Sequence, residues 1–155
     1  MKATGGFLPL YISLLLGLMG VLQTVSFNDF TTALQDYEVF PGATVELAAI
    51  AIIAAELAAA LLLIANPKQG AVVTGLVYLF WLSMALHGLT QGLDIPNCGC
   101  FGRFLSQPLT WWVIPQDLYV LAMAALIYRG VNKRAKVDDL EDAENLATSG
   151  TDIAA

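Results

Sequence analysis

The stretch AAIAIIAAELAAALLLIA, residues 48–65, decides the fold class of this chain. Its apolar residues come in continuous blocks that only Glu56 interrupts, without the period-two alternation of a membrane β-strand, so a helix remains. At a rise of about 1.5 Å per residue, about 20 residues cross a hydrocarbon core of about 30 Å. The stretch therefore predicts a transmembrane helix.

Three further runs of similar length and composition accompany this one. Of the 155 residues, 57% are hydrophobic and 13% charged, and the mean hydropathy of +0.68 is far above that of a soluble domain. We predict an all-α integral membrane protein, a four-helix bundle of one domain, 1–130, whose partner is the lipid bilayer. The predicted spans are 7–25, 43–65, 70–91 and 109–128.

Positive charges near the ends of the spans predict the orientation. Arg103 alone falls on one side of a four-span chain, and the opposite side holds Lys2, Lys68, Arg129, Lys133, Arg134 and Lys136. By the positive-inside rule both termini are cytoplasmic, and the loop 92–108 is periplasmic if the membrane is the inner membrane of a bacterium. The alternative, that the first run is a cleaved signal peptide, leaves this orientation unchanged.

The segment after the last span, 131–155, is rich in acids. Six of the 13 acidic residues lie after Val137, in a chain of net charge −6. Such a charged run predicts a solvated, disordered cytoplasmic tail rather than a site for a basic partner. The sequence carries no basic stripe, phosphate-binding glycine loop or HExxH motif, which argues against a nucleic-acid partner.

The first outer loop, 26–42, carries apolar residues at helical spacing. They follow Ser26 and Asp29, a candidate capping pair, and they are Phe27, Phe30, Leu34 and Tyr37. We predict a short helix on the membrane surface. It acts either as a lid over the second outer loop or, the favoured interpretation, as a plain connector.

The string NCGCFGR, residues 97–103, carries the chemistry. Cys98 and Cys100 are the only cysteines, and Gly99 permits the backbone angles that so small a disulfide ring demands. A ring this short gains little stability from its cross-link, whereas a strained, accessible disulfide is easily reduced by a partner thiolate. The pair therefore predicts a catalytic thiol–disulfide exchange site, with Arg103 stabilising the Cys100 thiolate.

Other interpretations of these residues stay open. One alternative is that the two cysteines form a structural disulfide, which shapes the docking loop of a non-catalytic accessory subunit. A two-thiolate site for Cu(I) is a further alternative, because soft thiolates favour that ion. Arg103 has an alternative role as a contact to a lipid phosphate.

Ionisable side chains inside the predicted spans are costly and need a partner or a function. The ionisable residues nearest the cysteines are Glu46, His87 and Asp117. Gln91 is grouped with them because it shares a helix face with His87. Thiol oxidation releases protons, so these supporting groups are candidates to accept them. Glu56 lies deeper, and we expect it to be protonated and hydrogen-bonded between helices, too deep to touch the cysteine loop.

A quinone is the candidate cofactor, because a membrane thiol oxidase needs an electron acceptor. The predicted contacts are His87 as a donor and Trp111 and Trp112 as aromatic walls. The simpler alternatives are a helix–helix hydrogen bond for His87 and an ordinary interfacial position for the two tryptophans.

The string Cys98-Gly99-Cys100-Phe101-Gly102, between the third and fourth predicted spans, resembles the signature of the methylamine utilisation protein MauE family, part of a wider DoxX-like group. Weaker similarities are YEVFP, residues 37–41, and Glu56. The resemblance implies an inner-membrane protein that assists maturation of the methylamine dehydrogenase small subunit. It also implies disulfide formation or shuffling, by a thiol–disulfide oxidoreductase acting with a thioredoxin-like periplasmic protein or directly on the exported client.

Overall fold

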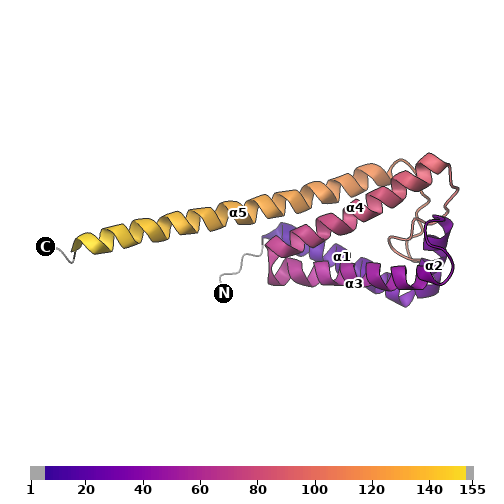
Figure 1. Ribbon diagram of the computed structural model, residues 1–155, viewed down its shortest axis with the longest axis horizontal. Helices are drawn as coiled ribbons and strands as arrows, with labels where there is room; N and C mark the ends of the chain where they lie inside the picture. The colour runs from indigo at the N-terminus through magenta and orange to yellow at the C-terminus, as the bar shows by residue number, and fades with distance from the viewer. Residues whose placement is uncertain (1–5, 153–155) are drawn as a thin grey trace.

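Five helices and their connecting loops make up the computed structural model, which describes residues 6–152 but leaves out the side chains of residues 139 and 142–152. The helices are α1 (Phe7–Val25), α2 (Phe27–Asp36), α3 (Thr44–Ala65), α4 (Pro67–Gln91) and α5 (Val113–Asp152). α1, α3, α4 and the first half of α5 form an up-and-down bundle, and α2 lies across one end of it (Figure 1). The prediction of an all-α bundle is confirmed.

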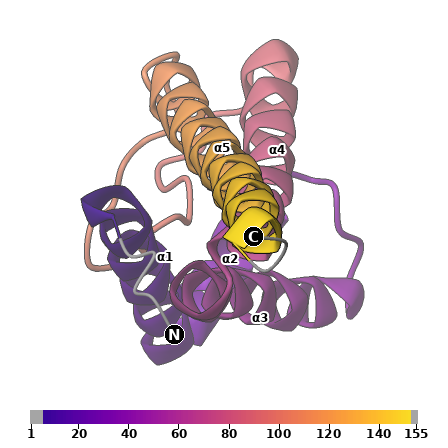
Figure 2. The ribbon, with the colours of Figure 1, turned by 90° about the vertical axis from the view of Figure 1, so that its left-hand side faces the viewer.

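The order of the helices around the bundle leaves one side loosely closed. α1 packs on α3, α3 on α4 and α4 on α5, whereas α1 and α5 touch only slightly. The end-on view shows the same pairs, α1 with α3 and α4 with α5 (Figure 2). Between α1 and α3 the packing is close, because Ser13 Oγ donates a hydrogen bond of 2.7 Å to the Ala60 carbonyl and Gly20 lies against Leu57.

Three of the described helices, α1, α3 and α4, are long and apolar enough to cross a membrane. The chain is therefore a multi-pass membrane protein. α4 begins three residues earlier than the predicted start at residue 70. The reason is local: the Asn66 side chain accepts a hydrogen bond from the Gln69 backbone N–H at 3.3 Å, and Pro67 occupies the first helical position.

The fourth predicted span, 109–128, differs from the structure at both ends. Residues 109–112 precede the helix, and α5 begins at Val113 and continues far beyond residue 128. Its first turns contain Pro115, Gln116 and Asp117, which lower its hydropathy below that of the other three long helices. A membrane crossing by the part of α5 that packs on α4 stays a prediction.

The prediction of a disordered tail is wrong for residues 131–152, because α5 continues through them to Asp152 and projects from the bundle (Figure 1). Ten of its 22 residues are Ala, Leu, Glu, Lys or Arg, which favour helix, and it contains no proline. Charge alone predicted disorder, whereas the helix propensity of the same residues was the stronger signal.

The predicted helix of the first outer loop is present as α2. Its inner face, with Phe30, Ala33 and Leu34, is buried against the bundle. The predicted capping pair is wrong, because Ser26 Oγ donates instead to the Leu22 carbonyl at 2.7 Å and makes no cap hydrogen bond. α2 is therefore held by packing across the end of the bundle rather than by its cap.

Basic side chains lie at the end of the bundle opposite α2. Lys68, in the turn between α3 and α4, places its Nζ 5.8 Å from the ring centre of Tyr128. Gly70 makes this turn possible, since a Cβ there would come 2.4 Å from the Leu63 backbone nitrogen. The turn and the α2 end thus mark the two ends of the bundle.

Candidate functional site

The loop between α4 and α5 folds back on itself and presents the two cysteines. The Cys98 N–H donates to the Gln107 carbonyl at 2.8 Å, and the Leu109 N–H donates to the Ile95 carbonyl at 2.9 Å. The Asn97 side chain accepts from the Gly99 N–H and donates to the Gly102 carbonyl, at 3.1 and 2.9 Å. These bonds hold the loop in one conformation on both sides of the cysteines.

The two thiols lie beside each other. Cys98 Sγ and Cys100 Sγ are free and 3.4 Å apart, and a disulfide bond is about 2.05 Å long, so a small side-chain movement would close it. Gly99 has φ +88°, and a Cβ there would lie 3.4 Å from the Cβ of Ala33 and 3.5 Å from the ring of Phe30. Its backbone angle therefore favours glycine, and a Cβ there would make ordinary contacts with α2.

The two sulfurs differ in acidity and in access. The hydrogen bond from Cys100 lowers the pKa of the Cys98 thiol below its ordinary value, although burial opposes this. The pKa of Cys100 is raised, first because it keeps the proton shared with Cys98 and second because it is buried. Cys98 is 3% exposed, whereas Cys100 is half-buried. Cys98 is therefore the more acidic thiol, on the less exposed of the two residues.

A buried polar chain connects the loop with the interior of the bundle. Gln23 Nε2 donates to the Cys100 carbonyl at 3.1 Å and to Glu56 Oε1 at 3.4 Å, and Trp81 Nε1 donates to the same oxygen at 2.8 Å. Glu56 is thus hydrogen-bonded between α1, α3 and α4. It makes no direct contact with the cysteine loop, but one residue, Gln23, joins the two.

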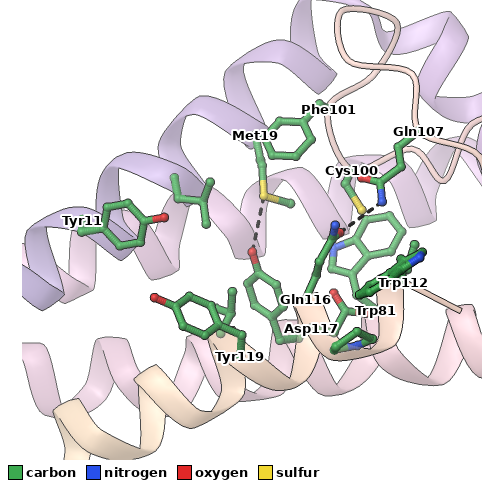
Figure 3. Close-up of a pocket in the computed structure, with 15 residues that line it drawn as sticks. Tyr11, Met19, Trp81, Cys100, Phe101, Gln107, Trp112, Gln116, Asp117 and Tyr119 are labelled. Carbon is green, nitrogen blue, oxygen red and sulfur yellow. Dashed lines mark hydrogen bonds between the residues drawn. The ribbon is translucent and has the colours of Figure 1, made fainter. Parts of the chain in front are cut away.

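A cavity of about 520 Å³ lies next to Cys100, between α1, α4 and α5 (Figure 3). Asp117, buried near the start of α5, forms part of its wall, and Asp117 Oδ2 has no hydrogen-bond partner among the described residues. The other lining residues are Tyr11, Leu15, Met19, Tyr78, Trp81, Phe101, Gln107, Trp112, Val113, Pro115, Gln116, Tyr119 and Val120.

α2 is fastened to the cysteine loop at two points. The buried Tyr37 hydroxyl donates to the Cys98 carbonyl at 3.2 Å, and burial raises the pKa of Tyr37, so the phenol stays protonated. On the outside, Asp29 Oδ2 lies 4.0 Å from the Arg103 guanidinium. These contacts favour the lid over the plain connector.

Comparison with known proteins shows where the chain belongs. The family model described as methylamine utilisation protein MauE matches residues 1–129, which include the cysteine loop and the whole cavity wall. The chain belongs to the MauE family. It is 23% identical over 147 residues to the methylamine utilization protein MauE of Paracoccus denitrificans, covering 93% of this chain and 78% of that protein. No solved structure matches.

Two of the predicted supporting residues in this MauE family protein lie apart from the cavity on α4. His87 is half-buried and Gln91 is exposed, and neither lines the cavity beside Cys100. The structure therefore does not bring this pair to the cavity beside Cys100. His87 and Gln91 lie about one helical turn apart on α4, but the face of α4 that lines the cavity carries Tyr78 and Trp81.

The remaining predicted site residues divide into two groups. Asp117 and Trp112 line the cavity with Cys100. Glu46 is exposed in the first turn of α3, and Trp111 is exposed outside the cavity.

Arg103 does not contact a sulfur in the MauE family protein. Its side chain is 64% exposed, and besides Asp29 it lies over the ring of Phe104, 5.5 Å from the ring centre. The predicted pairing of Arg103 with a Cys100 thiolate is therefore not the arrangement in the structure, where the charge holds the loop to α2.

Gln23 is the functional candidate that the sequence analysis missed. It is fully buried in α1 and touches both the cysteine loop and Glu56. A signal existed, because a glutamine near the outer end of an otherwise apolar span needs hydrogen-bond partners. The partner, 77 residues away in the chain, was not evident from the sequence.

Proposed function

We propose that this protein is a membrane thiol–disulfide redox protein in which Cys98 and Cys100 exchange with the thiols of an exported client or of a thioredoxin-like carrier. The observation that supports this most directly is the sulfur pair itself. Two thiols 3.4 Å apart, in a loop held by hydrogen bonds and with unequal acidity, suit the repeated making and breaking of one bond.

The difference between the sulfurs suggests the order of events when the oxidised pair acts on a client dithiol. A client thiolate attacks the accessible Cys100 sulfur, the Cys98–Cys100 bond breaks, and Cys98 leaves as the thiolate. The lowered pKa of Cys98 makes it the better leaving group. The second client thiolate then attacks the mixed disulfide and releases Cys100, so the client loses two electrons and the protein gains them.

The location proposed for this exchange follows from charge and redox environment. Basic residues at the turn between α3 and α4 and along α5 support a cytoplasmic location for that end, by the positive-inside rule. The cysteine loop, at the opposite end, then faces the periplasm of a bacterial inner membrane, an oxidising compartment. The family name points to methylamine utilisation, and the proposed client is an exported protein of that process, such as the methylamine dehydrogenase small subunit.

Mass-shift alkylation of native membranes across a glutathione titration tests the proposal. We expect one two-electron transition of the pair, at a potential near that of the exporting compartment. In cells, Cys100 of the Cys98→Ser variant should attack the disulfide of an oxidised client or carrier, release one of its thiols and remain trapped as a mixed disulfide. Cys100→Ser should trap much less. Ser106→Ala, in the same loop, is the matched control and should trap nothing.

Other outcomes lead to different functions. A pair that never changes its redox state, together with full client maturation in the double serine variant, would establish a non-catalytic docking role. Cu(I) bound by the reduced protein and lost in both serine variants, with maturation rescued by added copper, would establish copper handling. Either result contradicts the exchange proposal.

A further inference from the structure

The cavity beside Cys100 lies between α1, α4 and α5. It lies on the side of the bundle where α1 and α5 touch only slightly. At its far end from Cys100 are Tyr11 on α1, a candidate membrane span, and Tyr119 on α5, for which a crossing is predicted (Figure 3). Their side chains are 43% and 51% exposed. If both helices cross the membrane, a ligand that dissolves in the bilayer reaches the cavity between them.

The chemistry of the wall changes along the cavity. Near Cys100 it is polar and aromatic, with Gln107, Gln116 and Asp117 gathered beside Trp112 (Figure 3). Toward the tyrosines it is apolar, formed by residues such as Leu15 and Val120 on α1 and α5. Sites of this volume, mostly apolar with a few convergent polar groups, are typical of small-molecule binding.

The polar end is equipped to meet carbonyl oxygens. Gln107 Nε2 donates to Gln116 Oε1 at 3.2 Å, which leaves the Gln116 amide N–H groups free for a ligand. Asp117 is 4% exposed, and its Oδ2 is without a partner within the described chain. When protonated, this carboxyl is a further donor that reaches the cavity.

We infer that this cavity binds the ring of a membrane quinone, which accepts electrons from Cys98 and Cys100, with its apolar chain leaving between Tyr11 and Tyr119. The inference rests on the proposed function, since it supplies the electron acceptor for the same thiol pair. The ring lies at the polar end, where Gln116 and Asp117 donate to its oxygens and Trp112 covers one side. His87 and Trp111, the contacts predicted from sequence, lie outside this site.

The reaction balances without another reactant. Two S–H bonds break and one S–S bond forms, which releases two electrons and two protons. The quinone takes up both electrons and both protons, and two O–H bonds form to give the quinol. Cys100 lines the cavity and Cys98 lies 3.4 Å behind it, so the sulfur that meets the ring is adjacent to the one that closes the disulfide.

The test uses the full-length reduced protein in lipid nanodiscs under anaerobic conditions. Decylubiquinone is added, its reduction is followed by absorbance, and the thiols are counted by alkylation. We expect one quinone reduced per disulfide formed. Val120→Phe fills the cavity and should lower the rate of quinone reduction, relative to exchange with glutathione disulfide, by about tenfold or more. Val73→Phe, which fills a separate cavity between α3 and α4, should leave that ratio unchanged.

A second measurement uses only the wild-type protein, so it does not require any variant to fold. An azido-quinone photolabel on the wild-type protein should modify wall residues of the cavity, such as Met19 and Tyr119, and excess decylubiquinone should prevent it. Exchange with glutathione disulfide without any quinone reduction would overturn the inference and leave the proposed function standing. Failure of both reactions would overturn both. Equal loss in the two valine variants, or labelling elsewhere, would also overturn the inference.

Discussion

At the scale of single residues, the two thiols of the site differ in acidity and in position. Cys98 is buried and receives hydrogen bonds from the Cys100 side chain and backbone, which favour its thiolate. Cys100 is the sulfur that reaches the cavity. A hydrogen bond to the charged form lowers a pKa, and burial raises it, so the balance at each sulfur depends on its immediate neighbours.

The pH dependence of alkylation tests this asymmetry. Since the pKa of Cys98 is lowered, its thiolate persists to lower pH, and its alkylation should have a midpoint below the ordinary value of about 8.5. Cys100→Ala removes the donor and should move that midpoint upward. The measurement is the iodoacetamide rate against pH, read by mass spectrometry of the Cys98 peptide. An identical midpoint in both proteins would contradict the assignment.

Gln23 provides a second test at this scale. Gln23→Leu removes a donor from Glu56 and from the Cys100 carbonyl inside the bundle. Loss of buried hydrogen bonds should lower the free energy of unfolding by about 1–3 kcal/mol, measured by denaturant titration in detergent. Gln35→Leu, on the exposed side of α2, is the matched control. Equal stability of the two variants would show that Gln23 has no such bridging role.

At the scale of elements, α2 controls access to the cysteine loop. It covers Gly99 with Phe30 and Ala33 and ends at Tyr37, which holds the Cys98 carbonyl. The helix has the amphipathic pattern of a surface helix, yet its apolar face packs on protein. Gly99 lies against α2, but it is the positive φ of Gly99 that favours glycine there.

Tyr37→Phe should loosen this cover. It deletes one buried hydrogen bond, worth about 1 kcal/mol, so opening should become about fivefold more frequent. Alkylation of Cys98 at fixed pH should accelerate by that factor. Tyr128→Phe, at the opposite end of the bundle, serves as the control. An unchanged rate in Tyr37→Phe would mean that α2 does not limit access.

At the scale of the whole molecule, the bundle places the cysteine loop at one end and the basic residues at the other (Figure 1). The cavity lies between α1 and α5, the pair of neighbouring helices that touch only slightly. Cys100 therefore lies both in the loop at the end of the bundle and in the wall of the cavity between α1 and α5.

Impermeant-maleimide labelling of intact spheroplasts tests this arrangement and the fourth crossing together. Reduced Cys100 should be labelled from outside. In the double serine background, Lys68→Cys and Lys136→Cys should be labelled only after permeabilisation, because the positive-inside rule places both in the cytoplasm. Labelling of the Lys136→Cys protein in intact cells would show that α5 does not cross the membrane.

The sequence by itself determined the features that depend on local composition. Continuous apolar blocks predicted α1, α3 and α4, spacing predicted α2, and the cysteine pair with Gly99 predicted the loop, whose glycine does adopt a positive φ. The tail was predicted wrongly, because its charge was weighed above its helix propensity.

Only the tertiary structure decided which side chains meet. α3 and α4 are largely apolar on all sides, so their sequence does not show which face turns inward. His87 lies outside the cavity beside Cys100, whose wall on α4 is formed by Tyr78 and Trp81. The bond between Gln23 and the Cys100 carbonyl joins residues 77 positions apart. In lipid, apolarity places a helix in the membrane, but the rotation of each helix is set by packing and hydrogen bonds with its neighbours.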